Sequence, residues 1–304
     1  MNEKKTAIFL CGGGALGAWQ SGALSFINEK KIDAQAISGF SIGAINSAFY
    51  CFNSVDKIEK IWSKMDNKKI FKFSLGYSRP VDISIAEENK NPVKKIISRI
   101  ENFLSGVNLF SNKPVYKILS KYISKKAEFK KNLKFYCISH CVERSAPYIT
   151  EFDSDNYERN RFIKMVVASS TIPFIFPQVK EESRWGEVHL VDGGVIGREN
   201  INFSFFEGFS DIFVISNVLD EDYYFKPRFP FSITEIFEKR LRRILVYQNK
   251  KIIKSLSHLK SKPNIHLINP LKPLDARIMD FDGKKAVKLF EDGRKTAMEF
   301  FKKL

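Results

Sequence analysis

The stretch Gly39-Phe40-Ser41-Ile42-Gly43 places one serine between two glycines, at the end of one apolar run and the start of another. Glycine permits the sharp backbone turn that leads from a strand into a helix. A serine on such a turn is presented at an exposed tip, an arrangement called a nucleophile elbow. The stretch therefore predicts a nucleophilic Ser41 on a strand–turn–helix unit, with Gly39 and Gly43 shaping the turn.

A glycine-rich loop lies one short element upstream. Residues 12–17 read Gly-Gly-Gly-Ala-Leu-Gly and follow the apolar run 6–11. Backbone N–H groups at the start of a helix bind anions, including the oxyanion that forms when a serine attacks an ester. The expected donors are the N–H groups of Gly12, Gly13, Gly14 and Ile42. Nucleophile and anion cradle on two consecutive turns are typical of an acyl hydrolase.

Serine is a weak nucleophile until a base accepts its proton. Asp192 follows the apolar run 188–191 and opens Asp192-Gly193-Gly194, so we expect it at the rim of the sheet. Gly193 and Gly194 permit tight backbone beside the carboxylate. Burial raises the proton affinity of such an aspartate toward the range useful for a base. Ser41 and Asp192 are thus predicted to form a catalytic dyad.

Together these segments resemble the patatin-like phospholipases, which combine a Gly-Gly-Gly-x-x-Gly loop, a Gly-x-Ser-x-Gly elbow and an Asp-Gly-Gly turn. The block 168–177, Ala-Ser-Ser-Thr-Ile-Pro through Phe-Pro, is also similar to one in this family, and 111–119 is similar to a weaker segment. The resemblance covers residues 6–217 and implies hydrolysis of phospholipids or lysophospholipids by the dyad, without a cofactor. Leu16 departs from the family, because many members carry Arg or Lys there.

The order of elements predicts the fold class and the domain organisation. Strands are expected at 6–11, 34–38, 133–140, 148–152, 211–217 and 265–268, with helices at 16–29, 42–51 and 158–169, while 55–130 reads as mostly helical. Alternating strands and helices predict an α/β three-layer sandwich with a mostly parallel central sheet. We expect one domain over 1–304, with a C-terminal extension at 218–304. Whether 66–110 forms a lid stays open.

Two other classes of site compete with the dyad. A Ser–His–Asp esterase is an alternative that uses His258 or His266, since triads are recognised by geometry. A non-enzymatic nucleotide- or lipid-binding protein is the second alternative. The loop 12–17 fits a dinucleotide fingerprint, but that fingerprint needs an acidic residue at the end of the next strand. Asp33 precedes the strand 34–38, so no ribose-binding group is placed there.

Charge and composition indicate the environment. The chain carries a formal charge of +16, which favours anionic partners such as phospholipid surfaces. Two basic stretches are predicted to be amphipathic helices, and anionic membranes are their expected partner: Lys113, Lys117, Lys121 and Lys125, then Lys239, Arg240, Arg242, Arg243, Lys250, Lys251 and Lys254. No motif predicts nucleic-acid binding. Oligomeric state stays open.

Four cysteines in 304 residues neither indicate a disulfide scaffold nor show metal-ligand spacing with the histidines. No apolar run reaches the length of a membrane span. The apolar start of the chain runs directly into the glycines of the proposed site, so we expect no signal peptide. A cytoplasmic protein, peripheral at membranes, is predicted.

Overall fold

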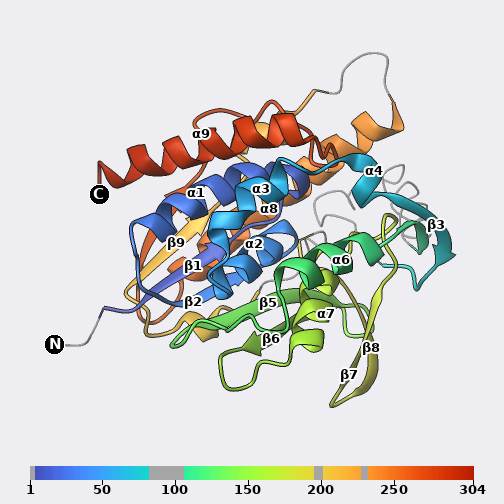
Figure 1. Cartoon of the computed structure of the whole chain (residues 1–304), viewed down its shortest axis with the longest axis horizontal. Helices are drawn as coiled ribbons and strands as arrows, with labels where there is room; N and C mark the ends of the chain where they lie inside the picture. The colour runs from blue at the N-terminus through green and yellow to red at the C-terminus, as the bar shows by residue number, and fades with distance from the viewer. Residues whose placement is uncertain (1–3, 82–105, 195–200, 227–231) are drawn as a thin grey trace.

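A central sheet of eight strands organises the molecule (Figure 1). The computed structural model describes residues 4–81, 106–194, 201–226 and 232–304. Within them the sheet runs in the order β10-β9-β1-β2-β5-β8-β7, and β6 pairs with β5. The strands of this sheet are β1 (Thr6–Leu10), β2 (Ala34–Gly39), β5 (Lys134–Cys141), β6 (Ala146–Phe152), β7 (Val179–Ser183), β8 (Gly186–Asp192), β9 (Asp211–Ile215) and β10 (Asn264–Ile268).

The sheet is mostly parallel. The pairs β10–β9, β9–β1, β1–β2 and β2–β5 are parallel, whereas β6, β7 and β8 add antiparallel pairs. Buried apolar residues fill β1, from Ala7 to Leu10, because a strand in the middle of a parallel sheet is covered on both faces. The carboxyl ends of β1 and β2 lie side by side, since Leu10 pairs with Gly39.

Helices flank this sheet. In Figure 1, α1 and α2 lie in front of the strands and α8 passes behind them. The α-helices are α1 (Gly17–Glu29), α2 (Ile42–Cys51), α3 (Ile58–Trp62), α4 (Asn67–Ile70), α6 (Lys113–Tyr122), α7 (Arg159–Ser169), α8 (Ile233–Ser257) and α9 (Gly283–Phe301). The described residues also form the 3₁₀ segments η1 (Gly14–Leu16), η2 (Val55–Lys57), η4 (Ser204–Phe206) and η5 (Asp220–Tyr224). The predicted α/β sandwich is confirmed.

The C-terminal helix α9 returns to the N-terminal part of the fold. It lies along α1 in Figure 1, and Trp19 on α1 donates through Nε1 to Asp292 Oδ2 at 3.0 Å. Arg294 and Glu29 form an ion pair at 2.6 Å across the same two helices. The two ends of the chain therefore share one packed region, although the pattern of motifs is confined to the first two thirds.

The strands predicted from sequence are all present, with small shifts at their ends. The prediction that 55–130 is mostly helical is wrong in part, because β3 (Lys72–Tyr77) and β4 (Val107–Ser111) pair antiparallel in a separate two-stranded sheet. In β3, Phe73, Leu75 and Tyr77 alternate with other residues, which is the period of two expected of a strand, and the helical prediction did not use this signal. Of the segment 66–110, residues 82–105 lie outside the described residues.

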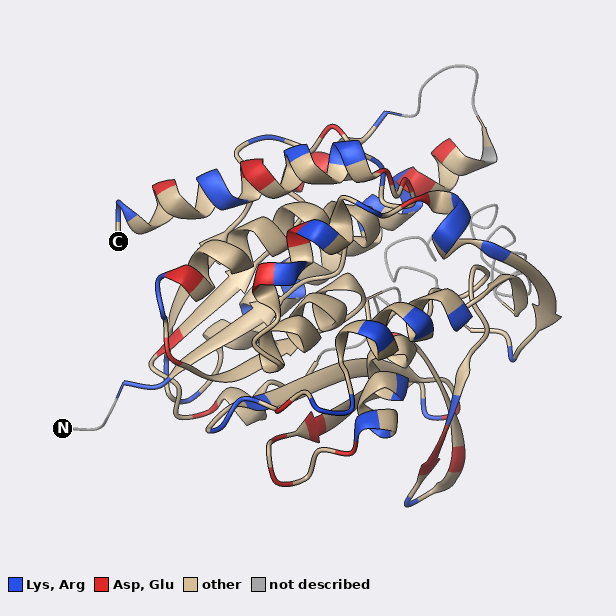
Figure 2. Ribbon diagram, viewed as in Figure 1, with Lys and Arg blue, Asp and Glu red and all other residues tan. Residues whose placement is uncertain are grey.

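Both basic stretches are helical except at Lys125, which lies in a turn beyond the end of α6. The two stretches differ in exposure. Lys113, Lys117 and Lys121 are exposed on α6, as the blue segments of Figure 2 show. Arg242 on α8 is 2% exposed, and it forms ion pairs with Asp222 and Glu238. The expectation that the whole α8 stretch meets a membrane is therefore wrong for Arg242, which neutralises two buried carboxylates. No helix in the described part of the chain has the length and hydropathy needed to cross a bilayer.

Candidate active site

Ser41 occupies the turn between β2 and α2, as its sequence context predicts. Its backbone has φ 55° and ψ −132°, a left-handed conformation that is uncommon for residues other than glycine. The surroundings hold this strained turn in place: the Ser41 N–H donates to Ser169 O at 2.9 Å and to Ser169 Oγ at 3.1 Å. Such conformations persist only where neighbouring structure supports them, and they concentrate at functional sites.

Strand β5 brings Ser41 and Asp192 together. Because β6 occupies one edge of β5, both β2 and β8 lie along its other edge. They run toward each other there, with Gly39 opposite Cys137 and Asp192 opposite Ser139. Adjacent positions along a strand are about 3.3 Å apart. The carboxyl end of β8 therefore meets the turn that carries Ser41.

Asp192 is fully buried, and hydrogen bonds satisfy its carboxylate only in part. Its Oδ1 accepts the Gly194 N–H at 2.7 Å, while Oδ2 has no hydrogen-bond partner among the described residues. Burial raises the pKa of the Asp192 carboxyl to about 7, and the nearby Ser41 side chain and the Gly194 N–H offset part of this rise. Desolvation dominates because a carboxylate without enough donors is costly in a low-dielectric site. The group changes protonation near neutral pH, as a general base requires.

The segment 168–173 joins the two halves of the site. Ser169 O accepts the Ser41 N–H, and Thr171 O accepts the Asp192 N–H at 2.9 Å. Ser169 Oγ also donates to Ile138 O on β5 at 2.6 Å. The sequence resemblance identified this block without a role for it. In the structure it connects the turn of Ser41, the middle of β5 and the carboxyl end of β8.

The glycine loop approaches Ser41 too closely for side chains. A Cβ on Gly12 would lie 3.2 Å from Ser41 Cβ and 2.6 Å from the Phe40 ring. Gly14 has φ 54°, and a Cβ there would lie 2.2 Å from the carbonyl oxygen of Ile278. Asn217 Nδ2 holds the loop from behind by donating to Gly12 O at 3.0 Å.

The N–H groups of the loop are available for an incoming anion. Within the described residues, the N–H groups of Gly12, Gly13, Gly14 and Ile42 donate to no backbone or side-chain acceptor. Ala15, the next residue, instead donates to Ile278 O at 2.7 Å. These four donors lie on the two turns that follow the paired ends of β1 and β2. The arrangement suits an oxyanion.

A small cavity collects five of the predicted site residues. Gly13, Gly14, Ser41, Asp192 and Gly194 all line it. The dyad, the glycine loop and the Asp-Gly-Gly turn therefore face one space. The other predicted residues lie outside this lining: Gly12, Gly39, Ile42, Gly43 and Gly193. Gly193 O accepts from Gln248 Nε2 at 3.3 Å.

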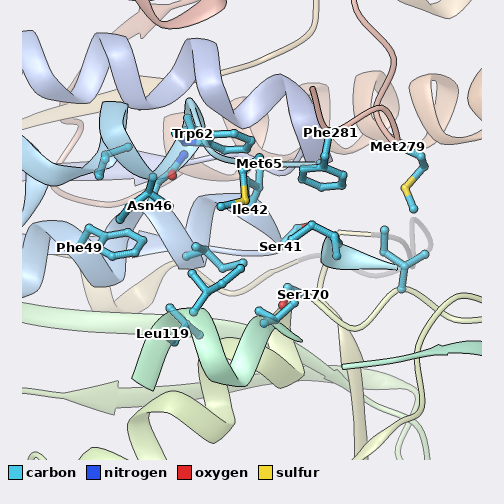
Figure 3. Close-up of a pocket in the computed structure, with 18 of the residues that line it drawn as sticks. Ser41, Ile42, Asn46, Phe49, Trp62, Met65, Leu119, Ser170, Met279 and Phe281 are labelled. Atoms are coloured by element: carbon cyan, nitrogen blue, oxygen red, sulfur yellow. The ribbon is translucent and has the colours of Figure 1, made fainter. Parts of the chain in front are cut away.

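A larger apolar pocket begins at the same serine (Figure 3). Ser41, Gly14 and Ile172 line both spaces. The pocket is walled by α2, α3, α6 and a C-terminal segment, and Figure 3 shows these side chains around Ser41: Ile42, Asn46, Phe49, Trp62, Met65, Leu119, Ser170, Met279 and Phe281. Such a lining suits a long hydrocarbon group.

Sequence reasoning missed the C-terminal residues that complete the site. Leu241, Ile244 and Leu245 of α8, with Ile278, line the small cavity, and Met279 and Phe281 line the pocket. The spacing of the three α8 residues is a helical apolar face that indicates burial. The segment 276–281 carries no such signal.

A buried ionic cluster positions that segment. The Ile278 N–H donates to Glu238 Oε2 at 2.9 Å, and Arg242 Nε donates to Glu238 Oε1 at 2.7 Å. Arg242 also contacts Asp222 and donates to Ala276 O. Because Ile278 O in turn accepts from the loop at Ala15, the cluster supports the oxyanion loop indirectly.

The histidines of the triad alternative have other partners. His266 Nε2 lies 2.8 Å from Asp211 Oδ1 at the amino end of β9, and His258 Nδ1 lies 2.6 Å from Lys254 O at the exposed end of α8. Within the described residues, no histidine lines either space at Ser41. The nucleotide-binding alternative needs an acidic residue at the end of β2 to bind the ribose. Strand β2 ends at Gly39, and Asp33 precedes the strand. The described residues also include no cluster of His, Cys, Asp or Glu suited to a metal.

Comparison with known proteins identifies the family. The model of the patatin-like phospholipases matches residues 8–206, and the chain belongs to this family. No curated protein sequence matches it.

Solved structures similar to the chain include VipD from Legionella pneumophila, with 11% identity and a TM-score of 0.48, over 99% of this chain and 67% of VipD. The ExoU–SpcU complex from the type III secretion system of Pseudomonas aeruginosa gives 16% identity and a TM-score of 0.35, over 98% of this chain. The chain spans about half the length of that matched protein, 51%.

Proposed function

We propose that the protein is a serine acyl hydrolase that cleaves acyl esters of phospholipids or lysophospholipids. One observation carries the proposal: Ser41, the buried Asp192 and the glycine loop line one cavity, and an apolar pocket opens from the same serine. Membership of the patatin-like phospholipase family supports the assignment to lipid hydrolysis.

In the proposed reaction, the Ser41 hydroxyl attacks the ester carbonyl carbon while the Asp192 carboxylate accepts its proton. The carbonyl oxygen becomes an oxyanion that the N–H groups of Gly12, Gly13, Gly14 and Ile42 stabilise. The tetrahedral intermediate collapses, the alcohol leaves with the proton from Asp192, and an acyl-serine remains. Water then attacks this ester with Asp192 again as base, which releases the fatty acid and restores Ser41.

The apolar pocket is the proposed acyl-chain site. Each methylene group transferred from water into such a lining contributes about 0.8 kcal/mol. The lining of this pocket is almost wholly hydrocarbon, which suits a long acyl chain. Long-chain lipids are therefore the expected substrates in preference to short, water-soluble esters.

The proposal extends to organisation and location. We infer one domain over residues 1–304, because C-terminal residues complete both spaces at Ser41 and α9 packs on α1. The acyl-enzyme reaction needs a nucleophile, a base and an oxyanion site, so its chemistry requires no cofactor. A lipid substrate implies action at membrane surfaces, with the exposed lysines of α6 facing anionic headgroups.

Product analysis on mixed-lipid vesicles tests the function. Wild-type protein should release fatty acid and react with a fluorophosphonate probe, whereas Ser41→Ala should do neither. Ser47→Ala is the matched control, because Ser47 is a buried serine of α2, the helix that follows Ser41, and its hydroxyl contacts Ser38 O. It should retain both activities. Hydrolysis that persists in folded Ser41→Ala contradicts the assignment of the nucleophile.

A further inference from the structure

Strand β3 exposes an apolar surface that the proposed reaction does not use. Phe73, Leu75 and Tyr77 are 75%, 68% and 59% exposed, and we call these three residues the β3 patch. All six residues of β3 are exposed. The strand pairs with β4 in a two-stranded sheet at the right of Figure 1, away from the C-terminus. Contiguous exposed apolar residues of this kind mark interaction sites.

The β3 patch adjoins the proposed acyl-chain pocket. Ile70, at the end of α4, lines that pocket. Phe71 packs its ring against Phe176 and Phe281, two further lining residues, with ring centroids 6.0 and 5.8 Å apart. Between Ile70 and Phe73 the chain spans about 10 Å at most. The β3 patch therefore lies next to the residues that line the pocket.

Exposed lysines surround the patch. Lys68 on α4, Lys72 on β3, and Lys113 and Lys117 on α6 are exposed, and we call these the patch lysines. Lys72 lies opposite Ser111, which is followed closely by Lys113. Within the described residues none of the four forms an ion pair with an acidic side chain. Figure 2 shows these blue segments on α4, at the start of β3 and along α6.

We propose that the β3 patch inserts into the interface of an anionic phospholipid bilayer, with the patch lysines bound to lipid phosphates. Aromatic and aliphatic side chains beside unpaired cations are what binding to such an interface requires, because apolar groups enter the acyl boundary while cations stay with the headgroups. An acidic protein could also bind the lysines. The adjoining apolar pocket, however, favours a lipid surface as the partner of the patch. This docking rests on the proposed function and deepens it, because it brings the pocket close to the surface that holds the substrate.

Vesicle co-sedimentation of Ser41→Ala protein tests docking without lipid breakdown. Vesicles of phosphatidylcholine, with and without phosphatidylglycerol, are the probes. The double variant Phe73→Ser/Leu75→Ser should bind phosphatidylglycerol vesicles at least about tenfold more weakly, since two apolar groups no longer leave water. The matched control is Trp185→Ser, because Trp185 is an exposed aromatic residue at the β7–β8 turn. It should bind as the parent does.

Charge reversal tests the lysines separately. Lys68→Glu/Lys72→Glu/Lys113→Glu should abolish the preference for phosphatidylglycerol over phosphatidylcholine alone, because each cation near an anionic surface contributes to binding. The control is Lys302→Glu/Lys303→Glu, at the exposed C-terminus far from β3 in Figure 1. Its preference should be unchanged.

A fluorescent dye at the β3 patch distinguishes insertion of the patch into the bilayer from electrostatic attraction to the bilayer surface. The four native cysteines are buried, so a Leu75→Cys variant can be labelled selectively with an environment-sensitive fluorophore. Its emission should shift to the blue with phosphatidylglycerol vesicles, whereas a label at Leu271→Cys, another exposed position, should not shift. Equal binding of the Phe73→Ser/Leu75→Ser variant, or binding without the shift at position 75, overturns the proposal.

The docking proposal and the proposed function fail in different assays. A water-soluble short-chain ester reports on the reaction without a membrane, and Phe73→Ser/Leu75→Ser should hydrolyse it at the parental rate. Retained hydrolysis in Ser41→Ala contradicts the proposed nucleophile while lost vesicle binding in the β3 variant still supports docking. Loss of soluble-ester hydrolysis in a folded β3 variant overturns docking as the role of the patch.

Discussion

Replacing Asp192 by Asn should remove activity and change how stability depends on pH. Asp192 is fully buried, with one oxygen bonded to Gly194 and the other without a partner in the described residues. Asn preserves the shape and the acceptor for the Gly194 N–H, but it can neither ionise nor take the proton of Ser41. The expected loss in kcat/KM is at least about 10³, because the base of an acyl transfer is removed.

The effect on stability follows from the pKa. Burial raises the pKa of Asp192 from 3.8 to about 7, so the folded state holds its proton where the unfolded chain has lost it. Linkage then makes the wild-type protein progressively less stable as pH rises from about 4 to about 7, whereas the Asp192→Asn variant has no such dependence at this position. With these two values, wild type should lose roughly 2.5 kcal/mol relative to Asp192→Asn between pH 5 and pH 8.

Urea denaturation of both proteins at several pH values measures this difference. All other titrating groups are shared, so the difference between the two curves isolates Asp192. A difference that stays constant from pH 5 to pH 8 refutes the reasoning, because Asp192 then titrates as in an unfolded chain. Constant offsets, such as the cost of burying the new amide, do not affect the slope.

Four other results are expected. The kcat/KM of wild type on a soluble ester should fall about tenfold per unit as pH drops below the Asp192 pKa of about 7, and a flat profile contradicts Asp192 as base. Gly14→Ala should lose at least about 10² in kcat/KM, because its Cβ meets the Ile278 carbonyl oxygen at 2.2 Å; unchanged kinetics argue against the loop geometry. Arg242→Met should lower the free energy of unfolding by about 3–5 kcal/mol in urea, since two carboxylates stay buried without their cation, and a change below about 1 kcal/mol contradicts this. His258→Ala should keep kcat/KM within about twofold, while a loss of several orders in folded protein supports a triad.

The local parts of the site could be predicted from the sequence. Gly13 and Gly14 have positive φ angles that other residues avoid, and such turns depend on neighbouring residues alone. Gly39 and Gly43 flank Ser41 in a pattern that the sequence shows directly. The apolar runs before them predict the strands β1 and β2. The strand-to-helix units, the fold class and the family therefore follow from short segments of the chain.

Only the tertiary structure brings the local parts of the site together. Asp192 lies beside Ser41 because β2 and β8 run toward each other along one edge of β5, and strand order is not encoded in any local pattern. Residues of α8 and Ile278 complete the site, and the buried Arg242 holds the Ile278 segment in place. The sequence context of Arg242 instead predicted a basic helix that faces a membrane.

Burial is the physical reason why some features follow from the local sequence and others only from the tertiary structure. Backbone turns are selected by local steric limits, so a few residues determine them. The pKa of Asp192, the ion pairs of Arg242 and the exposure of β3 depend on which groups the folded chain removes from water, and distant segments contribute those groups only after the sheet and its helices have packed.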